Sequence, residues 1–277
     1  MESYKMRKLL DNFMKALVWL ALVVALIPLF IIIIEIFSKG ASNINIDILI
    51  SPMPTVGERG GGIANAIQGT LITICLASIL GVPLGVLSGI FLSEYGDVKI
   101  SSTVRLFNDV LSGFPSIVIG IFSYTLIVTY IGFSVMAAAF ALAIIMIPIV
   151  TRTTEEALKI VPLTVREAAL ALGISRWRTL VYIVIRGAKR GIVTGILLAI
   201  ARVAGESAPV LITMGYWRWW FSGLNRPVAN LALNIYLFAV SPFENWRNLA
   251  WASALVLTAI ILFINLGLRI FTKEKYI

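Results

Sequence analysis

Four long stretches of this sequence contain no Asp, Glu, Lys or Arg, and they constrain its fold more than any other feature. The longest runs from residue 110 to 151, and the others run from 16 to 34, 60 to 93 and 248 to 268. A helix of about 20 apolar residues spans a bilayer, so the longest stretch has room for two crossings. Only 13% of the residues are charged, whereas a soluble domain carries about 25%. The sequence therefore predicts an integral membrane protein and excludes a water-soluble globule.

The predicted fold is an all-α integral membrane protein with six transmembrane helices. Gly132, Phe133 and Ser134 offer a tight turn that divides the longest stretch into two helices. A further apolar segment near residues 191 to 216 is interrupted only by Arg202 and Glu206. The six spans are predicted at about 16–37, 66–92, 110–131, 134–151, 192–214 and 249–270.

Basic residues are distributed unequally between the two sides of these spans. The side that includes both termini holds 17 Lys and Arg, and the opposite side holds 5. Lys and Arg collect on the cytosolic side, so we expect a multi-pass protein of the cell (plasma or inner) membrane with both termini cytosolic. A cleaved signal peptide is the alternative for the first span, but the apolar run has the length of a full span and no small-x-small cleavage site follows it. The net charge of +9 follows from the same asymmetry and gives no reason to expect nucleic-acid binding.

This topology divides the chain into three parts. Residues 1–59 are predicted to form a cytosolic tail, the first transmembrane helix and an outer loop. Residues 60–271 form a transmembrane domain with five helices and a long cytosolic loop at about 152–190, and residues 272–277 form a second cytosolic tail. Within the second span, Gly81, Gly85 and Gly89 recur every four residues and predict close packing of a neighbouring helix.

The loop after the second span mixes charges of both signs. It contains Glu94, Asp97, Lys99, Arg105 and Asp109. Such a pattern is typical of a solvated surface, and we predict no specific role for these residues.

Several chemistries are excluded by the absence of residue types. The sequence has no histidine, so Ser-His-Asp triads and imidazole metal ligands are impossible. Its single cysteine, Cys75, can form no internal disulfide and is expected to be a small packing residue. The phosphate-binding pattern G-x-x-x-x-G-K-[ST] does not occur. We therefore predict no catalytic residue, no metal site and no cofactor.

The cytosolic loop between the fourth and fifth spans has the pattern of a short capped helix. Thr164 and Glu167 have the spacing of a capping box, and Pro162 prevents an earlier helix from continuing. Gly173 can end the helix in the left-handed conformation, and Ser175 can cap a second helix. An amphipathic helix lying on the lipid headgroups is the alternative interpretation of this segment.

Motifs in and around this loop resemble a known family. The string Glu167-Ala168-Ala169, followed after three residues by Gly173, resembles the loop with which permease subunits of ATP-binding cassette importers dock onto their ATPase subunits. The segments 60–66, 114–120 and 201–209 narrow the resemblance to the phosphate-specific importers, and to their permeases of the PstA type. The resemblance is continuous from about Gly60 to Arg269. One departure is Arg186, which follows Ile183-Val184-Ile185 where the family usually has a proline, so the turn after the docking helix is expected to be either straighter or differently anchored than usual.

This resemblance implies the type I importer permease fold with a cytosolic coupling helix, in which Glu167, Ala168, Ala169 and Gly173 contact the ATPase. It implies a phosphate permease subunit that is not itself an enzyme, because ATP hydrolysis belongs to a partner. The implied partners are a second homologous permease, two ATPase subunits, an extracytoplasmic phosphate-binding protein and membrane lipid.

Arg202 and Glu206 are a charged pair within the fifth predicted span. Because they are four residues apart, a continuous helix places them on one face. A charge in the bilayer centre costs about 2.5 to 3.5 kcal/mol or more, so the pair is expected to face the protein interior. One interpretation is an ion pair that only fixes helix packing. The other is a substrate-path site, in which Arg202 binds the anion, Glu206 orients the arginine and lowers the net charge, and Ser207 offers a hydroxyl.

Three other functions are compatible with parts of the sequence. A permease for another oxyanion, such as sulfate or molybdate, is the nearest. A membrane-embedded enzyme using Glu206 is disfavoured because no second carboxylate lies near mid-depth of the membrane. A secondary transporter is disfavoured because inverted repeats are not evident.

Overall fold

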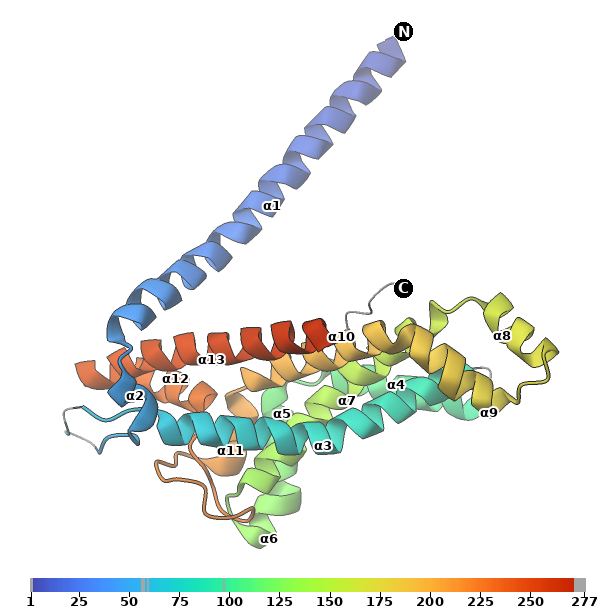
Figure 1. Ribbon diagram of the computed structural model, residues 1–277. Coiled ribbons are helices and arrows are strands. Elements are labelled where there is room, and N and C mark those ends of the chain that lie inside the picture. The colour runs from blue at the N-terminus through green and yellow to red at the C-terminus, as the bar shows by residue number, and fades with distance from the viewer. Residues whose placement is uncertain (1, 56–57, 59, 97, 272–277) are drawn as a thin grey trace.

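The computed structural model describes residues 2–55, 58, 60–96 and 98–271, and every regular element within them is a helix (Figure 1). The predicted tail at 272–277 lies outside the described residues, as does Asp97. The α-helices are α1 Glu2–Asn43, α2 Ile46–Ile50, α3 Ala64–Glu94, α4 Lys99–Gly113, α5 Ser116–Ser123, α6 Thr129–Ile131, α7 Val135–Lys159, α8 Leu163–Ala171, α9 Arg176–Thr179, α10 Ile185–Ala204, α11 Ala208–Met214, α12 Leu231–Ala239 and α13 Glu244–Phe271. Two π-helical turns, η1 Tyr124–Val128 and η2 Leu180–Val184, continue α5 and α9.

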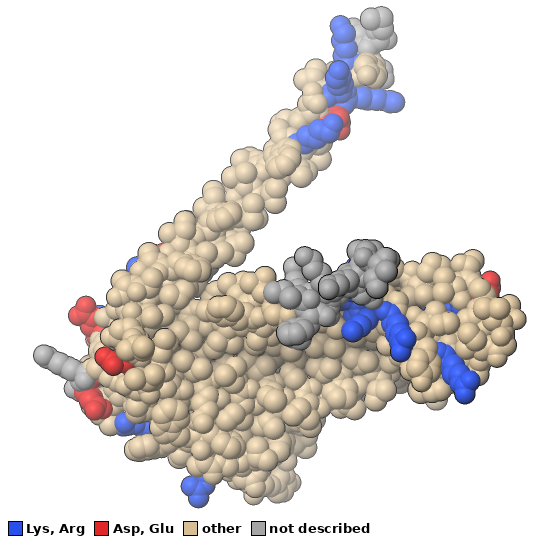
Figure 2. Space-filling view, viewed as in Figure 1, with Lys and Arg blue, Asp and Glu red and all other residues tan. Residues whose placement is uncertain are grey.

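Helix α1 extends away from the other helices (Figure 1). It contains the first predicted span, and none of its most apolar window is buried against the chain. It contacts α13 near its C-terminal end, where Gly40 lies so close to Leu255 that an added Cβ would be 2.7 Å from the leucine Cβ. In the view of Figure 2, the middle of α1 shows no charged side chain, while its free end carries Lys and Arg. This distribution suits a helix surrounded by lipid or by another apolar surface.

Helices α3 and α7 form the most extensive helix contact in the described chain. A Cβ added at Gly85 would lie 2.7 Å from Cβ of Val150, and one at Gly89 would lie 2.6 Å from Cβ of Thr154. Gly81 faces α7 in the same way. The predicted glycine packing face is therefore confirmed. Cys75, in contrast, is exposed on α3, so the expectation that it packs inside the chain is wrong.

The third predicted span is broken. Helix α4 and the segment from α5 to α6 meet at 104°, because the helix stops at Phe114 and restarts at Ser116. Phe114 has ψ 135°, as expected for a residue that precedes a proline. The prediction of a continuous helix over 110–131 is therefore wrong, although the turn after it is confirmed by Gly132 at φ +83° and by Ser134, which caps α7.

The fifth predicted span is broken as well. Helices α10 and α11 meet at 63°, with Gly205, Glu206 and Ser207 between them. Pro209, near the start of α11, has no N–H to donate to the carbonyl four residues earlier, which favours a break here. Within the described part of the chain, four helices are long and apolar enough to cross a membrane, and six spans result if each broken pair counts as one. The predicted number of six agrees with the second count.

Two residues of the segment predicted as a solvated mixed-charge loop, Glu94 at the end of α3 and Arg105 on α4, form specific ion pairs. Arg105 of α4 lies 2.7 Å from Glu155 of α7, and Lys159 lies 2.6 Å from the same carboxylate. Glu94 pairs with Arg166 of α8. The expectation that Glu94 and Arg105 are only solvated is therefore wrong.

Helix α12 was not predicted. Its N-cap residue Asn230 accepts hydrogen bonds from the N–H groups of Ala232 and Leu233, and Phe238 near its end is fully buried beside Trp246. The helix packs mainly on α13.

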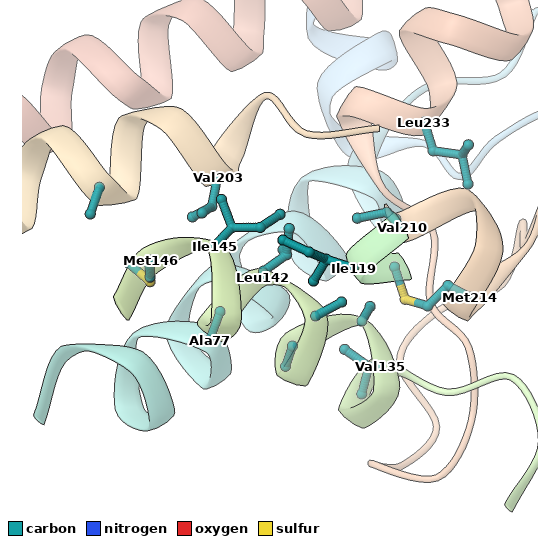
Figure 3. Close-up of a cluster of buried hydrophobic side chains, with 14 of the residues drawn as sticks. Ala77, Ile119, Val135, Leu142, Ile145, Met146, Val203, Val210, Met214 and Leu233 are labelled. Carbon is teal, nitrogen blue, oxygen red and sulfur yellow. The ribbon is translucent and has the colours of Figure 1, made fainter. Parts of the chain in front are cut away.

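A hydrophobic core joins the helices on which the broken spans lie (Figure 3). Ile119 of α5, Ile145 of α7, Val203 of α10 and Val210 of α11 are buried together. The two breaks are therefore held against a packed interior.

Candidate functional site

Arg202 and Glu206 lie at the break in the fifth predicted span. Arg202 is in the last turn of α10, and Glu206 lies beyond its end, where the backbone tightens through a hydrogen bond of 3.2 Å from the Glu206 N–H to the Val203 carbonyl. The Arg202 Nη2 atom is 3.7 Å from the Glu206 Oε1 atom. The expected proximity of the two side chains is present, but it comes from a helix end and not from one continuous helix.

The two side chains differ in exposure. The Arg202 side chain is 58% exposed and the Glu206 side chain is 17% exposed. A separation of 3.7 Å is longer than a hydrogen bond of about 2.7 to 3.2 Å. The carboxylate therefore attracts the guanidinium by charge without a close hydrogen bond, which leaves the fork of N–H donors available to a ligand.

Arg202 lines a cavity of about 230 Å³. The break between α4 and α5 contributes Ser112, Phe114 and Ser116 to its wall, and α7 contributes Ile145, Pro148 and Ile149. Of the three sequence candidates, only Arg202 is among the described residues that line this cavity. The cavity thus combines one permanent positive charge with two hydroxyl groups.

The short helices that follow the two breaks, α5 and α11, are packed together. A Cβ added at Gly120 of α5 would be 2.8 Å from the Pro209 Cα of α11, so these short helices touch through their backbones. Movement of one break is therefore expected to move the other.

Ser207 occupies the N-cap position of α11. Its side chain forms no capping hydrogen bond, whereas its carbonyl accepts from the Leu211 N–H at 2.8 Å.

The hydroxyls of Ser112 and Ser116 were not among the sequence candidates. Ser112 donates to the Asn108 carbonyl at 2.9 Å. The signal that could have found both is Pro115, because a proline within a predicted span marks a place where the helix opens.

The segment predicted to dock onto an ATPase forms α8, but its start differs from the prediction. Pro162 is the N-cap residue, and the helix begins at Leu163 with no side-chain cap. The predicted capping box of Thr164 and Glu167 is therefore wrong, because a proline with φ −57° already suits a helix start and moves Thr164 into the first turn.

The end of α8 is as predicted. Gly173 has φ +78°, its N–H donates to the Leu170 carbonyl at 2.9 Å, and the Ile174 N–H donates to the Ala169 carbonyl at 3.1 Å. These two bonds form a Schellman motif. Ser175 takes the predicted N-cap position of α9, but without a side-chain hydrogen bond.

The residues predicted to dock onto an ATPase lie on or just after a helix that protrudes from the bundle. Glu167 and Ala168 are exposed and Ala169 is buried. Exposed apolar side chains, Leu172 and Trp177, lie on either side of the turn that joins α8 to α9. The next helix runs from Arg176 to Ala204 without a break and includes Arg186.

Comparison with known proteins identifies the family. Residues 81–274 match the family described as binding-protein-dependent transport system inner membrane component. The phosphate transport system permease protein PstA of Yersinia pestis is 44% identical over 93% of this chain and 89% of its own length. The PstA of Pasteurella multocida is 42% identical over 97% and 96%.

The fold also matches a solved structure. A chain of the inward-facing MetNI methionine ABC transporter superposes with a TM-score of 0.60 and 19% identity, over 76% of this chain and 95% of that chain. This likeness shows the importer permease fold in a multi-pass membrane protein. By the family match and the identity to its relatives, the chain belongs to the binding-protein-dependent transport system inner membrane components and, within them, to the PstA permeases.

Proposed function

We propose that this chain is the membrane permease subunit of an ATP-driven phosphate importer. The observation that supports this most strongly is the identity of 41–46% to PstA phosphate transport permeases. Its role is to form the translocation path, while ATP is hydrolysed in partner subunits. The assembly includes a second homologous permease, two ATPase subunits and an extracytoplasmic phosphate-binding protein, and both termini of this chain are cytosolic.

Arg202 is the residue proposed to contact the passing anion. Its guanidinium remains charged at any physiological pH and matches the oxygens of phosphate with paired donors. Its high exposure and its place in the cavity wall support this role. A residue that only fixed helix packing would be expected to bury its charge against its partner.

Glu206 and Ser207, which lie in the break between α10 and α11, are proposed to contribute to the same anion site as Arg202. The carboxylate lowers the net charge beside Arg202, so the anion is attracted without being trapped. The Ser207 hydroxyl, which caps no helix, offers a further hydrogen bond to a solute that passes the break.

The coupling residues are proposed to be Glu167, Ala168, Ala169 and Gly173. The exposed side chains of α8 contact the ATPase, and Gly173 sets the direction of the turn that follows. The protruding position of α8 supports docking more than a helix lying flat on headgroups (Figure 1).

Phosphate uptake by variants of Arg202 and Glu206 tests whether Arg202 contacts the passing anion. Arg202→Gln should abolish uptake while the complex still assembles, since glutamine keeps donors but loses the charge. The double variant Arg202→Gln with Glu206→Gln should be equally inactive. Arg186→Gln, on an exposed stretch of the same helix, is the matched control and should transport normally.

A purely structural ion pair predicts the opposite. In that case the double variant leaves no lone buried charge, and uptake per assembled complex should return close to the unmodified rate. Competition by sulfate or molybdate, measured in the same assay, distinguishes the alternative of another oxyanion. Inhibition of phosphate uptake by either anion at equal concentration would favour that alternative.

A further inference from the structure

Arg166 connects the coupling helix α8 to the ends of two long helices. Its Nη1 forms an ion pair with Oε1 of Glu94, and its Nη2 donates to the Leu158 carbonyl at 3.1 Å. Glu94 is the last residue of α3, and Leu158 lies in the last turn of α7. A single guanidinium thus holds α8, α3 and α7 together.

The surroundings of this contact favour a strong interaction. The Arg166 and Glu94 side chains are 18% and 23% exposed, whereas those of the Arg152–Glu156 pair on α7 are 71% and 64% exposed. Exposed pairs contribute little because water screens them, and partly buried pairs are screened less. The C-terminal ends of α3 and α7 also carry partial negative charge, which adds to the attraction for a cation.

The contact also lies where α8 meets the other helices, so a movement of α8 would reach them through this contact. Within the described helices, the one packed most extensively on α8 is the short α9, and α8 lies at the far end of the bundle (Figure 1). Helices α3 and α7 pack closely through the glycine face, and α7 continues to Ile149, Pro148 and Ile145 in the wall of the Arg202 cavity. A continuous path of packed groups therefore runs from α8 to the cavity.

We infer that the Glu94–Arg166 ion pair transmits movement of α8 to α3 and α7, and so couples the ATPase subunits to the cavity. This inference rests on the proposed function, because it takes α8 as the helix that docks onto an ATPase. Glu94 is a positioning residue, since it acts through Arg166 and touches no solute.

The test measures ATPase activity of the purified complex with its binding protein, with and without inorganic phosphate. Glu94→Gln keeps the size of the side chain and removes its charge. We expect unchanged assembly and unchanged activity without phosphate, but a loss of stimulation by phosphate of about fivefold or more, which is the low end of typical coupling between sites. The number of ATP molecules hydrolysed per phosphate transported should rise. Glu156→Gln, which breaks the exposed pair on α7, should change none of these quantities.

Glu94→Asp provides a second variant if the first does not assemble. It keeps the charge but shortens the reach, so it should assemble and show an intermediate loss of stimulation. Full stimulation in either assembled variant would overturn the inference, and failure of Glu94→Asp to assemble would assign the pair to folding and overturn it as well. Absence of phosphate stimulation in the unmodified complex would instead refute the proposed function, and this inference with it.

Discussion

At the scale of single residues, the candidate site depends on how closely two backbones approach. Gly120 of α5 meets Pro209 of α11, where an added methyl group would lie 2.8 Å from the proline Cα. Backbone cannot move aside as a flexible side chain can, so the two helix breaks would be pushed apart.

Gly120→Ala should therefore lower both phosphate uptake and stability. Overpacking of a tight contact costs about 1 to 3 kcal/mol, which predicts a lower melting temperature of the purified complex. Gly113→Ala is the matched control, because an added Cβ there meets nothing within 4 Å. Equal uptake and equal melting temperatures for the two variants would contradict this reading of the contact.

The sequence could predict which residues are near each other only where they are near in the chain. The approach of Arg202 to Glu206 follows from their spacing, even though the helix ends between them. The contribution of Ser116 to the same cavity, and the pairing of Glu94 with Arg166, depend on packing between distant segments. Local periodicity carries no information on such contacts, so a loop of mixed charges was expected where specific ion pairs occur.

At the scale of elements, long apolar runs predicted helices well and predicted their interruptions poorly. Helices α3, α7 and α13 contain their predicted spans, because each is a long apolar run that needs only its own hydrogen bonds. The breaks at Phe114 and at Gly205 to Ser207 were missed, although Pro115 and Pro209 mark them, because each break lies within a segment that has the length and overall apolar character of one span. Helix α12 was missed because its apolar run is too short to be recognised as a span.

The turn after α8 gives a prediction at this scale. Gly173 has φ +78° with open space around it, so a substitution meets backbone strain but no clash. Gly173→Val should cost about 1 to 2 kcal/mol in the left-handed conformation, move α8 and reduce phosphate-stimulated ATPase activity. Gly173→Asn, which tolerates this conformation, should retain most of the stimulation. An equal loss of phosphate-stimulated ATPase activity in both variants would show that the backbone conformation at Gly173 does not cause the loss.

At the scale of the whole molecule, the arrangement separates two functional ends. Helix α8, the proposed coupling helix, lies at one end of the bundle, and the loop between α11 and α12 lies away from it (Figure 1). The imbalance of 17 to 5 basic residues is the reason for proposing that the end that carries α8 is cytosolic. The same rule predicts that the loop between α11 and α12 lies on the outer side. The proposed orientation therefore agrees with both the distribution of basic residues and the proposed docking of an ATPase.

Single cysteines can test this orientation in intact cells. The native thiol is removed first by Cys75→Ser, so that the introduced cysteine is the only thiol in the chain. Ser175→Cys, at the start of α9, and Ser222→Cys, in the loop after α11, both replace exposed serines. A membrane-impermeant thiol reagent added outside should label Ser222→Cys at once and Ser175→Cys only after the membrane is opened. Labelling of both positions from outside would mean that the number of crossings between them is even, and the six-span topology with cytosolic termini would have to be abandoned.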